Sequence, residues 1–206
     1  MDRPIVFDSA PTERADAARN RILLLATARE IIREQGFDRL TMDGLAERAG
    51  VGKGTVFRRF RTRAGIFEAL LDDDERDFQH QVLAGAPPLG PGAPPLDRLI
   101  AYGRARTAFL VEHLEIARAA LDGSKPVPIG HRAPISQIHI RMLLAQIGLR
   151  RVDLDMLSLQ LAAALDGPIL LYLSSDELTN SASSVDERGL RISKAWQDLV
   201  ERTCRP

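Results

Sequence analysis

The sequence has few of the features expected of a secreted, membrane or disulfide-bonded protein. Cys204 is its one cysteine, so it cannot form an intramolecular disulfide. The longest apolar stretch, near residues 161–173, contains Asp166, Gly167 and Pro168 and is too short to cross a bilayer. The first residues hold no apolar run long enough for a signal peptide. We therefore expect a soluble, cytoplasmic protein with no membrane partner.

Net charge, aromatic residues and strand-like patterns are also scarce. The 28 basic residues balance the 28 acidic ones, so no overall field attracts the chain to nucleic acid. Aromatic residues make up 5%, and runs of β-branched residues with a period of two are absent. Good helix formers dominate instead, and 45% of the 206 residues are hydrophobic, enough for a core. The sequence predicts an all-α protein.

Patterns that indicate catalysis or metal binding are missing. No two of the four histidines have helical i, i+3 or i+4 spacing, and none has a cysteine nearby. There is no nucleophile elbow, and the Gly-rich stretch around Lys53 does not match a phosphate-binding P-loop, because Gly54 follows the lysine where that motif needs serine or threonine. We expect no enzymatic activity, no metal and no cofactor. A helical small-molecule enzyme is the remaining alternative of that class.

Residues 41–60 have the pattern of a helix-turn-helix. Thr41 can cap a helix whose apolar residues recur at helical spacing up to Ala49. Gly50 ends this helix and Gly52 begins the next, whose apolar face ends at Phe60. From residue 48 to residue 67 there are six basic residues and no acidic one. Such a local cationic patch suits binding to phosphates, although a basic run can also be merely a solvated face.

These residues resemble a known family. The N-terminal DNA-binding domain of TetR-family transcriptional regulators is similar to residues 20–71, through Leu24, Leu25, Ala28, Ile32, Gly36, Phe37, Thr41, Leu45, Ala46, Ala49, Gly50, Val51, Gly52, Lys53, Gly54, Thr55, Val56, Phe57 and Phe60. This chain has Gly52 where the family commonly has serine, Phe57 where tyrosine is usual, and Arg63 in place of lysine. The resemblance implies an N-terminal three-helix domain that binds double-stranded DNA and a C-terminal helical body that binds a small molecule and dimerises.

The predicted DNA contacts lie on and beside the second helix of the motif. We expect Lys53, Thr55 and Arg58 to enter the major groove, with Arg58 positioned to bind guanine. We expect phosphate contacts from Thr41, Arg59, Arg61 and Arg63, with Phe57 on the same surface, while Gly52 and Gly54 let the duplex come close. Arg63→Ala is accordingly predicted to weaken binding to all sequences.

The chain divides by composition into three parts. Residues 1–17 have no periodicity and are expected to form a flexible arm, which either touches DNA or is simply a frayed terminus. Residues 18–62 form the DNA-binding domain, and residues 63–206 the body, beginning with a connector helix at 63–83. The Pro- and Gly-rich residues 84–95 break that helix.

Two sets of residues in the body are candidates for binding. Polar and aromatic residues within apolar helices predict a ligand pocket, namely Tyr102, Arg106, Phe109, His113, His139, Leu143, Gln146 and Tyr172. Apolar stripes in the last two helices predict a dimer interface with Leu157, Leu161, Leu165, Ile169, Leu190, Trp196 and Leu199, although they could pack only within one chain. We expect a homodimeric repressor released by an unidentified small-molecule effector; a ligand-independent or activating regulator is the alternative.

Overall fold

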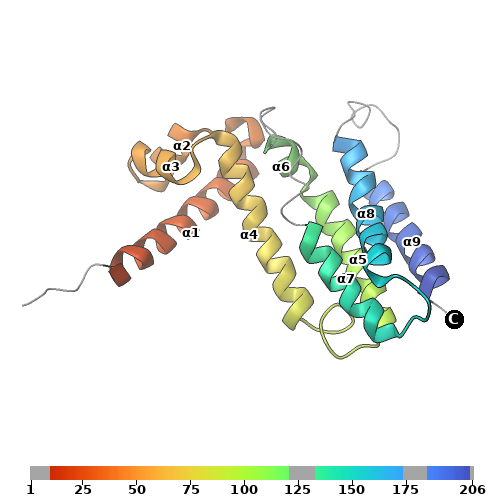
Figure 1. Ribbon diagram of the computed structural model, residues 1–206. Helices are drawn as coiled ribbons and strands as arrows, with labels where there is room; N and C mark the ends of the chain where they lie inside the picture. Colours follow the sequence, from red (N-terminus) through yellow and green to blue (C-terminus); the bar gives the residue numbers. More distant parts are fainter. Residues whose placement is uncertain (1–9, 121–132, 174–184, 205–206) are drawn as a thin grey trace, which may run out of the picture. The chain divides into compact units, whose positions relative to one another are not determined.

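The computed structural model describes the backbone of residues 10–120, 133–173 and 185–204, and the side chains of residues 16–120, 135–168 and 187–204 (Figure 1). All regular structure in these ranges is helical, as the composition predicts. The chain forms two units, residues 1–70 and residues 71–206, called here the N-terminal and the C-terminal unit. None of the helices in the described ranges is long and apolar enough to cross a membrane.

The N-terminal unit contains three α-helices, a short 3-10 helix and the start of a fourth α-helix. These are α1 (Ala10–Gln35), η1 (Phe37–Arg39), α2 (Met42–Ala49), α3 (Lys53–Phe60) and α4 (Arg63–Ala84). The boundary between the units falls inside α4, further along the chain than the predicted boundary at 62/63. The reason is that Ile66, Phe67 and Leu70, all 0% exposed, belong to the core of the N-terminal unit.

The start of α1 corrects one prediction. The helix begins at Ala10, so the predicted flexible arm, residues 1–17, is too long at its C-terminal end; residues 1–9 lie outside the described part. Pro11 is acceptable in the first turn of a helix, because the amide that proline lacks would have no partner there. The alanine, glutamate and arginine residues that follow favour the helical state.

Five helices follow in the described part of the C-terminal unit. They are α5 (Pro95–Glu112), α6 (Leu114–Ala119), α7 (Ala133–Ile147), α8 (Leu154–Leu173) and α9 (Val185–Cys204). The predicted interruption near His113 is confirmed, since α5 and α6 meet there. Helix α5 packs against both α7 and α9, and α7 packs against α8 (Figure 1).

The core of the C-terminal unit encloses part of the predicted dimer interface. Leu161 is 2% exposed, Leu165 1% and Trp196 3%, so these side chains pack within their own chain. Trp196 lies directly over Gly103 of α5, where a Cβ would come within 1.9 Å of the indole Nε1. That nitrogen donates a hydrogen bond to the carbonyl oxygen of Leu99 at 3.2 Å. Close approach of α5 and α9 therefore depends on glycine at position 103.

The remaining residues of the predicted dimer interface are partly buried, exposed or outside the described side chains. Leu157 is partly buried against the core, whereas Leu190 is 73% exposed and Leu199 is 36% exposed. The side chain of Ile169 lies outside the described residues. Helix α8 also exposes Met156 and Leu159, at 51% and 49%.

Candidate nucleic-acid interface and the interior of the C-terminal unit

The turn between α2 and α3 forms as the sequence predicts. The Thr41 Oγ1 accepts a hydrogen bond from the amide of Gly44 at 3.0 Å and so caps α2. Gly50 ends α2 with φ 66°, in the left-handed region that glycine enters without strain. Helix α3 begins after Gly52, which offers no side-chain cap. The first amides of α3 consequently have no side-chain acceptor at their N-cap.

Two glycines at the start of α3 have open space around them. A Cβ at Gly52 or Gly54 would meet nothing within 4 Å, so the packing of the protein does not require glycine there. Gly65 in α4 is different, because a Cβ would lie 2.1 Å from the carbonyl oxygen of Phe60. At the N-terminus of α3 no side chain of Gly52 or Gly54 covers the backbone, so another molecule can approach it closely.

The exposed basic residues of α3 differ in their partners. Arg58 is exposed and makes no hydrogen bond or ion pair within the described part of the chain. Arg61, with φ 64° just after α3, is likewise exposed and unpaired among the residues described. The Nζ of Lys53 lies 2.9 Å from Asp43 Oδ2, with both side chains more than two-thirds exposed at 74% and 70%. Such an exposed pair contributes little to stability and exchanges readily with phosphate.

Two other arginines that were predicted to contact DNA donate hydrogen bonds to backbone carbonyls within the N-terminal unit. Arg59 Nη2 donates to the carbonyl oxygen of Ala17 at 2.5 Å. Arg63 donates from Nε to the carbonyl of Leu40 at 2.7 Å and from Nη2 to that of Phe37 at 2.6 Å. Its guanidinium therefore ties the start of α4 to the segment before α2. The structure gives Arg63 this positioning role, and its phosphate contact stays a prediction.

The other predicted contact residues lie around these arginines. Thr41 is exposed, and its hydroxyl keeps a donor after capping α2. Thr55 is partly exposed, and Phe57 is 62% exposed on a helix whose Val56 and Phe60 are buried. One face of α3 is therefore held by the core, while the other presents Lys53, Phe57 and Arg58.

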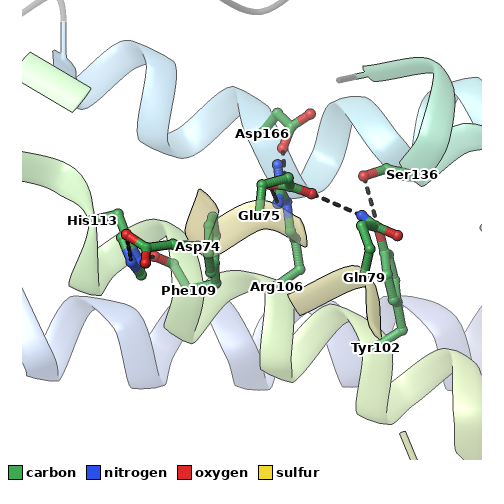
Figure 2. Close-up of polar contacts among 9 residues, drawn as sticks. All are labelled: Asp74, Glu75, Gln79, Tyr102, Arg106, Phe109, His113, Ser136 and Asp166. Carbon is green, nitrogen blue, oxygen red and sulfur yellow. Dashed lines mark hydrogen bonds and ion pairs between the residues drawn. The ribbon is translucent and has the colours of Figure 1, made fainter. Parts of the chain in front are cut away.

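Several candidate pocket residues meet in a polar network inside the C-terminal unit (Figure 2). Arg106 Nη1 donates to Glu75 Oε2 at 2.6 Å, and Asp166 Oδ1 lies 4.0 Å from Arg106 Nε. The guanidinium carbon of Arg106 also lies 5.2 Å from the centroid of the Phe109 ring. Burial raises the pKa of the Asp166 carboxyl, although the charge of Arg106 opposes this. The network joins α4, α5 and α8.

A second pair at one end of this network involves His113. Its Nδ1 donates to the carbonyl of Phe109 at 2.8 Å, and its Nε2 lies 3.2 Å from Asp74 Oδ2. Burial alone would lower the pKa of His113, but the hydrogen bond with Asp74, helped by the Phe109 carbonyl, raises it above its ordinary value. Phe109 and His113 also stack, with ring centroids 4.2 Å apart.

Tyr102 and His139 form the third part of the interior. The Tyr102 hydroxyl donates to Ser136 Oγ at 2.7 Å, and burial raises the pKa of this phenol. The Tyr102 ring packs against the imidazole of His139, with centroids 4.8 Å apart. Burial, together with the positive charge of Arg98, lowers the pKa of His139 to about 4.

Among the side chains described, the structure thus brings the predicted pocket residues to the interior, with one exception. Leu143 is fully buried in the same core, but Gln146 is exposed, and the side chain of Tyr172 lies outside the described residues. An open groove of about 430 Å³ lies elsewhere, along α9, beside Ile192 and Ala195. No cluster of three or more metal-ligating side chains occurs among the residues described.

Sequence reasoning missed Glu75, Asp166, Ser136 and Arg98 as interior residues. Glu75 belongs to an acidic run that reads as a solvated face. However, it is four residues after Leu71 and three before Phe78, so it falls on their apolar stripe. The same helical spacing places Arg98 on the face of Tyr102. The sequence signal that could have identified Glu75 and Arg98 as interior residues was their position on the apolar face of a helix.

Comparison with known proteins agrees with this arrangement. Residues 24–70 match the family model described as bacterial regulatory proteins, tetR family. Over 59 residues the chain is 36% identical to the DNA-binding transcriptional repressor TetR of Mycobacteroides abscessus. That match spans 29% of this chain and 31% of the repressor, which is less than a third of its length.

Solved structures share the fold over nearly the whole chain. A TetR-family transcriptional regulator from Pectobacterium atrosepticum is 20% identical, with a TM-score of 0.67, covering 94% of this chain and 98% of that one. A variant of TetR from Acinetobacter baumannii, in complex with minocycline, is 16% identical with a TM-score of 0.58, covering 89% and 97%. At these identities the likeness concerns the fold alone.

Proposed function

Because residues 24–70 match the family model described as bacterial regulatory proteins, tetR family, we propose that this chain is a transcriptional repressor of that family. In this proposal it binds a palindromic operator as a homodimer and leaves it when a small molecule binds the C-terminal unit. The observation that carries DNA recognition is the exposed face of α3, where Arg58 has no partner within the described residues and the nearby Gly52 and Gly54 leave the backbone bare.

The chemistry of this face suits the major groove. Arginine can donate two parallel hydrogen bonds to the O6 and N7 atoms of guanine, and Arg58 is free to do so. Lys53 and Thr55 precede it on the same helix and extend the contact surface. Thr41 and Arg61 are assigned to phosphates, while Arg59 and Arg63 hold the surface in place through the carbonyls they bind.

Operator binding by an Arg58→Ala variant tests this assignment. Losing one bidentate contact should cost about 1–3 kcal/mol on the specific site and relax preference at one base pair, with little change on random DNA. Arg33→Ala is the matched control, because Arg33 is exposed at 75% but lies at the end of α1. Gel-shift titrations on specific and randomised duplexes at fixed salt measure both. Equal losses on the two duplexes would refute the proposed base contact.

Homodimer formation is supported by the exposed apolar residues of the last two helices. Leu190 and Leu199 of α9, with Met156 and Leu159 of α8, are each at least 36% exposed. Large apolar side chains left exposed on neighbouring helices can belong to a protein–protein interface. A two-fold dimer would place two copies of α3 about 34–36 Å apart, one turn of duplex, and so double the number of base contacts.

Release by a ligand follows from linkage if the ligand prefers a shape that does not fit the operator. A related fold binds minocycline in the Acinetobacter baumannii protein, and the interior of this C-terminal unit contains several buried polar groups that a ligand could use. The expected coupling is about 1–3 kcal/mol, or roughly 5- to 150-fold in operator affinity. Gel shifts on the operator in the presence of candidate metabolites measure it, and affinity unchanged by any of them would favour a constitutive regulator.

A further inference from the structure

Arg98 is a buried cation without a counter-charge in the described part of the protein. It lies in α5, its residue is only 9% exposed, and its Nε is buried with no hydrogen-bond partner. No ion pair or other polar interaction joins it to a side chain within the described ranges. Buried charges in proteins are normally paired, because removing an isolated charge from water is costly. A mostly buried arginine with no ion pair in the described chain therefore indicates a site for an anion.

A second unused polar group lies on α7, where the His139 ring packs against Tyr102, one helical turn after Arg98 on α5. His139 of α7 is 7% exposed, and its Nε2 is also buried without a partner. The proximity of Arg98 disfavours the imidazolium form, so His139 is neutral at neutral pH. A neutral imidazole can carry its proton on Nε2 and donate one hydrogen bond. Arg98 and His139 together can thus offer donors to one acceptor group.

Arg106, the other buried arginine of α5, also has a buried Nε without a hydrogen-bond partner, but its charge is balanced. Its guanidinium is bonded to Glu75 and lies near Asp166, so two carboxylates already surround its charge. An anion at Arg106 would meet these carboxylates at close range. The two arginines, two helical turns apart on one helix, are therefore different: Arg106 is compensated and Arg98 is not.

We infer that Arg98 and His139 bind the carboxylate of a small amphiphilic monoanion inside the C-terminal unit. One guanidinium beside a neutral imidazole supplies a single positive charge, which a carboxylate balances and a phosphate dianion would exceed. The surroundings are apolar, since Tyr102, which packs on His139, belongs to the same hydrophobic cluster as Leu99, Ile140 and Leu143. The apolar part of the ligand packs in this environment. Its role as the effector rests on the proposed function, whereas binding itself does not.

Sodium benzoate and sodium butyrate are suitable probes, with benzamide and benzamidine as neutral and cationic analogues of benzoate. The full-length protein is titrated at constant ionic strength while its melting temperature and the NMR resonances of His139 are followed. A bound carboxylate should raise the melting temperature and raise the pKa of His139 by about one unit or more, since an opposite charge favours the imidazolium. Benzamide and benzamidine should do neither.

Arg98→Met and Arg104→Met form a matched pair, because Arg104 is exposed on the same helix. Arg98→Met should raise the melting temperature of the free protein, because it removes an uncompensated buried charge, and should abolish the response to carboxylates. Arg104→Met should keep the wild-type response.

Two results would overturn the inference: no response to either carboxylate in the wild type, or an equal response in Arg98→Met. Carboxylate binding that depends on Arg98 but leaves operator affinity unchanged would support the site and contradict its role as the effector site. Loss of operator binding by the free protein would instead count against the proposed function.

Discussion

His139 should make the C-terminal unit sensitive to mild acid. Its imidazole is buried in α7, and its pKa is lowered from 6.5 to about 4 by burial and by Arg98. The unfolded chain therefore takes up a proton at this residue at a higher pH than the folded chain does. Because the unfolded state binds more protons between these two values, stability falls as the pH drops from about 6.5 to about 4.

The two pKa values set the size of this effect. One pKa unit corresponds to about 1.36 kcal/mol, so a shift from 6.5 to about 4 corresponds to roughly 3 kcal/mol of unfolding free energy at the acid end of the window. Above about pH 7.5 this residue is neutral in both states and its contribution is constant. A loss of about 3 kcal/mol is a substantial part of the stability of an ordinary domain.

Urea denaturation of the wild type and of His139→Gln between pH 7.5 and pH 4.5 isolates this contribution. Trp196 is the one tryptophan and lies in the same core, so its fluorescence reports unfolding of the C-terminal unit. His113 titrates with the opposite sign, because a raised pKa stabilises the folded state at low pH and this is lost as pH rises through that pKa. It is present in both chains and cancels in their difference.

The variant should therefore gain stability relative to the wild type as the pH falls, by most of the 3 kcal/mol at pH 4.5. Any constant cost of the substitution appears at pH 7.5 and is subtracted. If the two stability curves run parallel across this range, His139 is not held neutral by the fold, and the reasoning from its burial and from Arg98 fails.

Two further predictions concern packing and assembly. Gly103→Ala should destabilise the C-terminal unit by about 1–3 kcal/mol or more in urea denaturation, because the new Cβ would lie 1.9 Å from Trp196 Nε1. Gly167→Ala is the control: a Cβ there would meet nothing within 4 Å, so the free energy of unfolding should change by about 1 kcal/mol or less. Leu199→Glu should shift the protein from dimer to monomer in sedimentation velocity. The control, Leu83→Glu, changes a 65% exposed position of α4 and should leave the dimer intact. A Leu199→Glu protein that is still dimeric would place the interface elsewhere.

The helix-turn-helix could be predicted in detail because its signals are local. Thr41 as an N-cap and Gly50 as a left-handed C-cap act on amides and carbonyls within a few residues, and both positions are confirmed. The apolar residues of α2 and α3 repeat at helical spacing, which fixes the buried face of each short helix. Neither inference required knowing where another element lies.

The C-terminal unit was predicted less completely, because a helix several turns long can bury more than one face. Leu161 and Trp196 lie on apolar stripes that the sequence could assign either to the core or to a second chain, and the structure assigns them to the core. Glu75 shows the opposite case: its buried position is stabilised by Arg106, thirty-one residues away, which a local pattern does not reveal. Pairings between distant helices decide such cases, and they depend on the tertiary arrangement.

The arginines show why residue type alone does not give the role of a charged side chain. Arg63 binds two backbone carbonyls and positions a helix, while Arg106 is held by carboxylates in the core. Arg58 is unpaired among the described residues but exposed, so water stabilises it until a nucleic acid replaces that water. Arg98 is mostly buried, its Nε has no hydrogen-bond partner, and no carboxylate of the described chain balances its charge. A mostly buried arginine without a partner is less stable than an exposed one. A bound anion would balance the charge of Arg98.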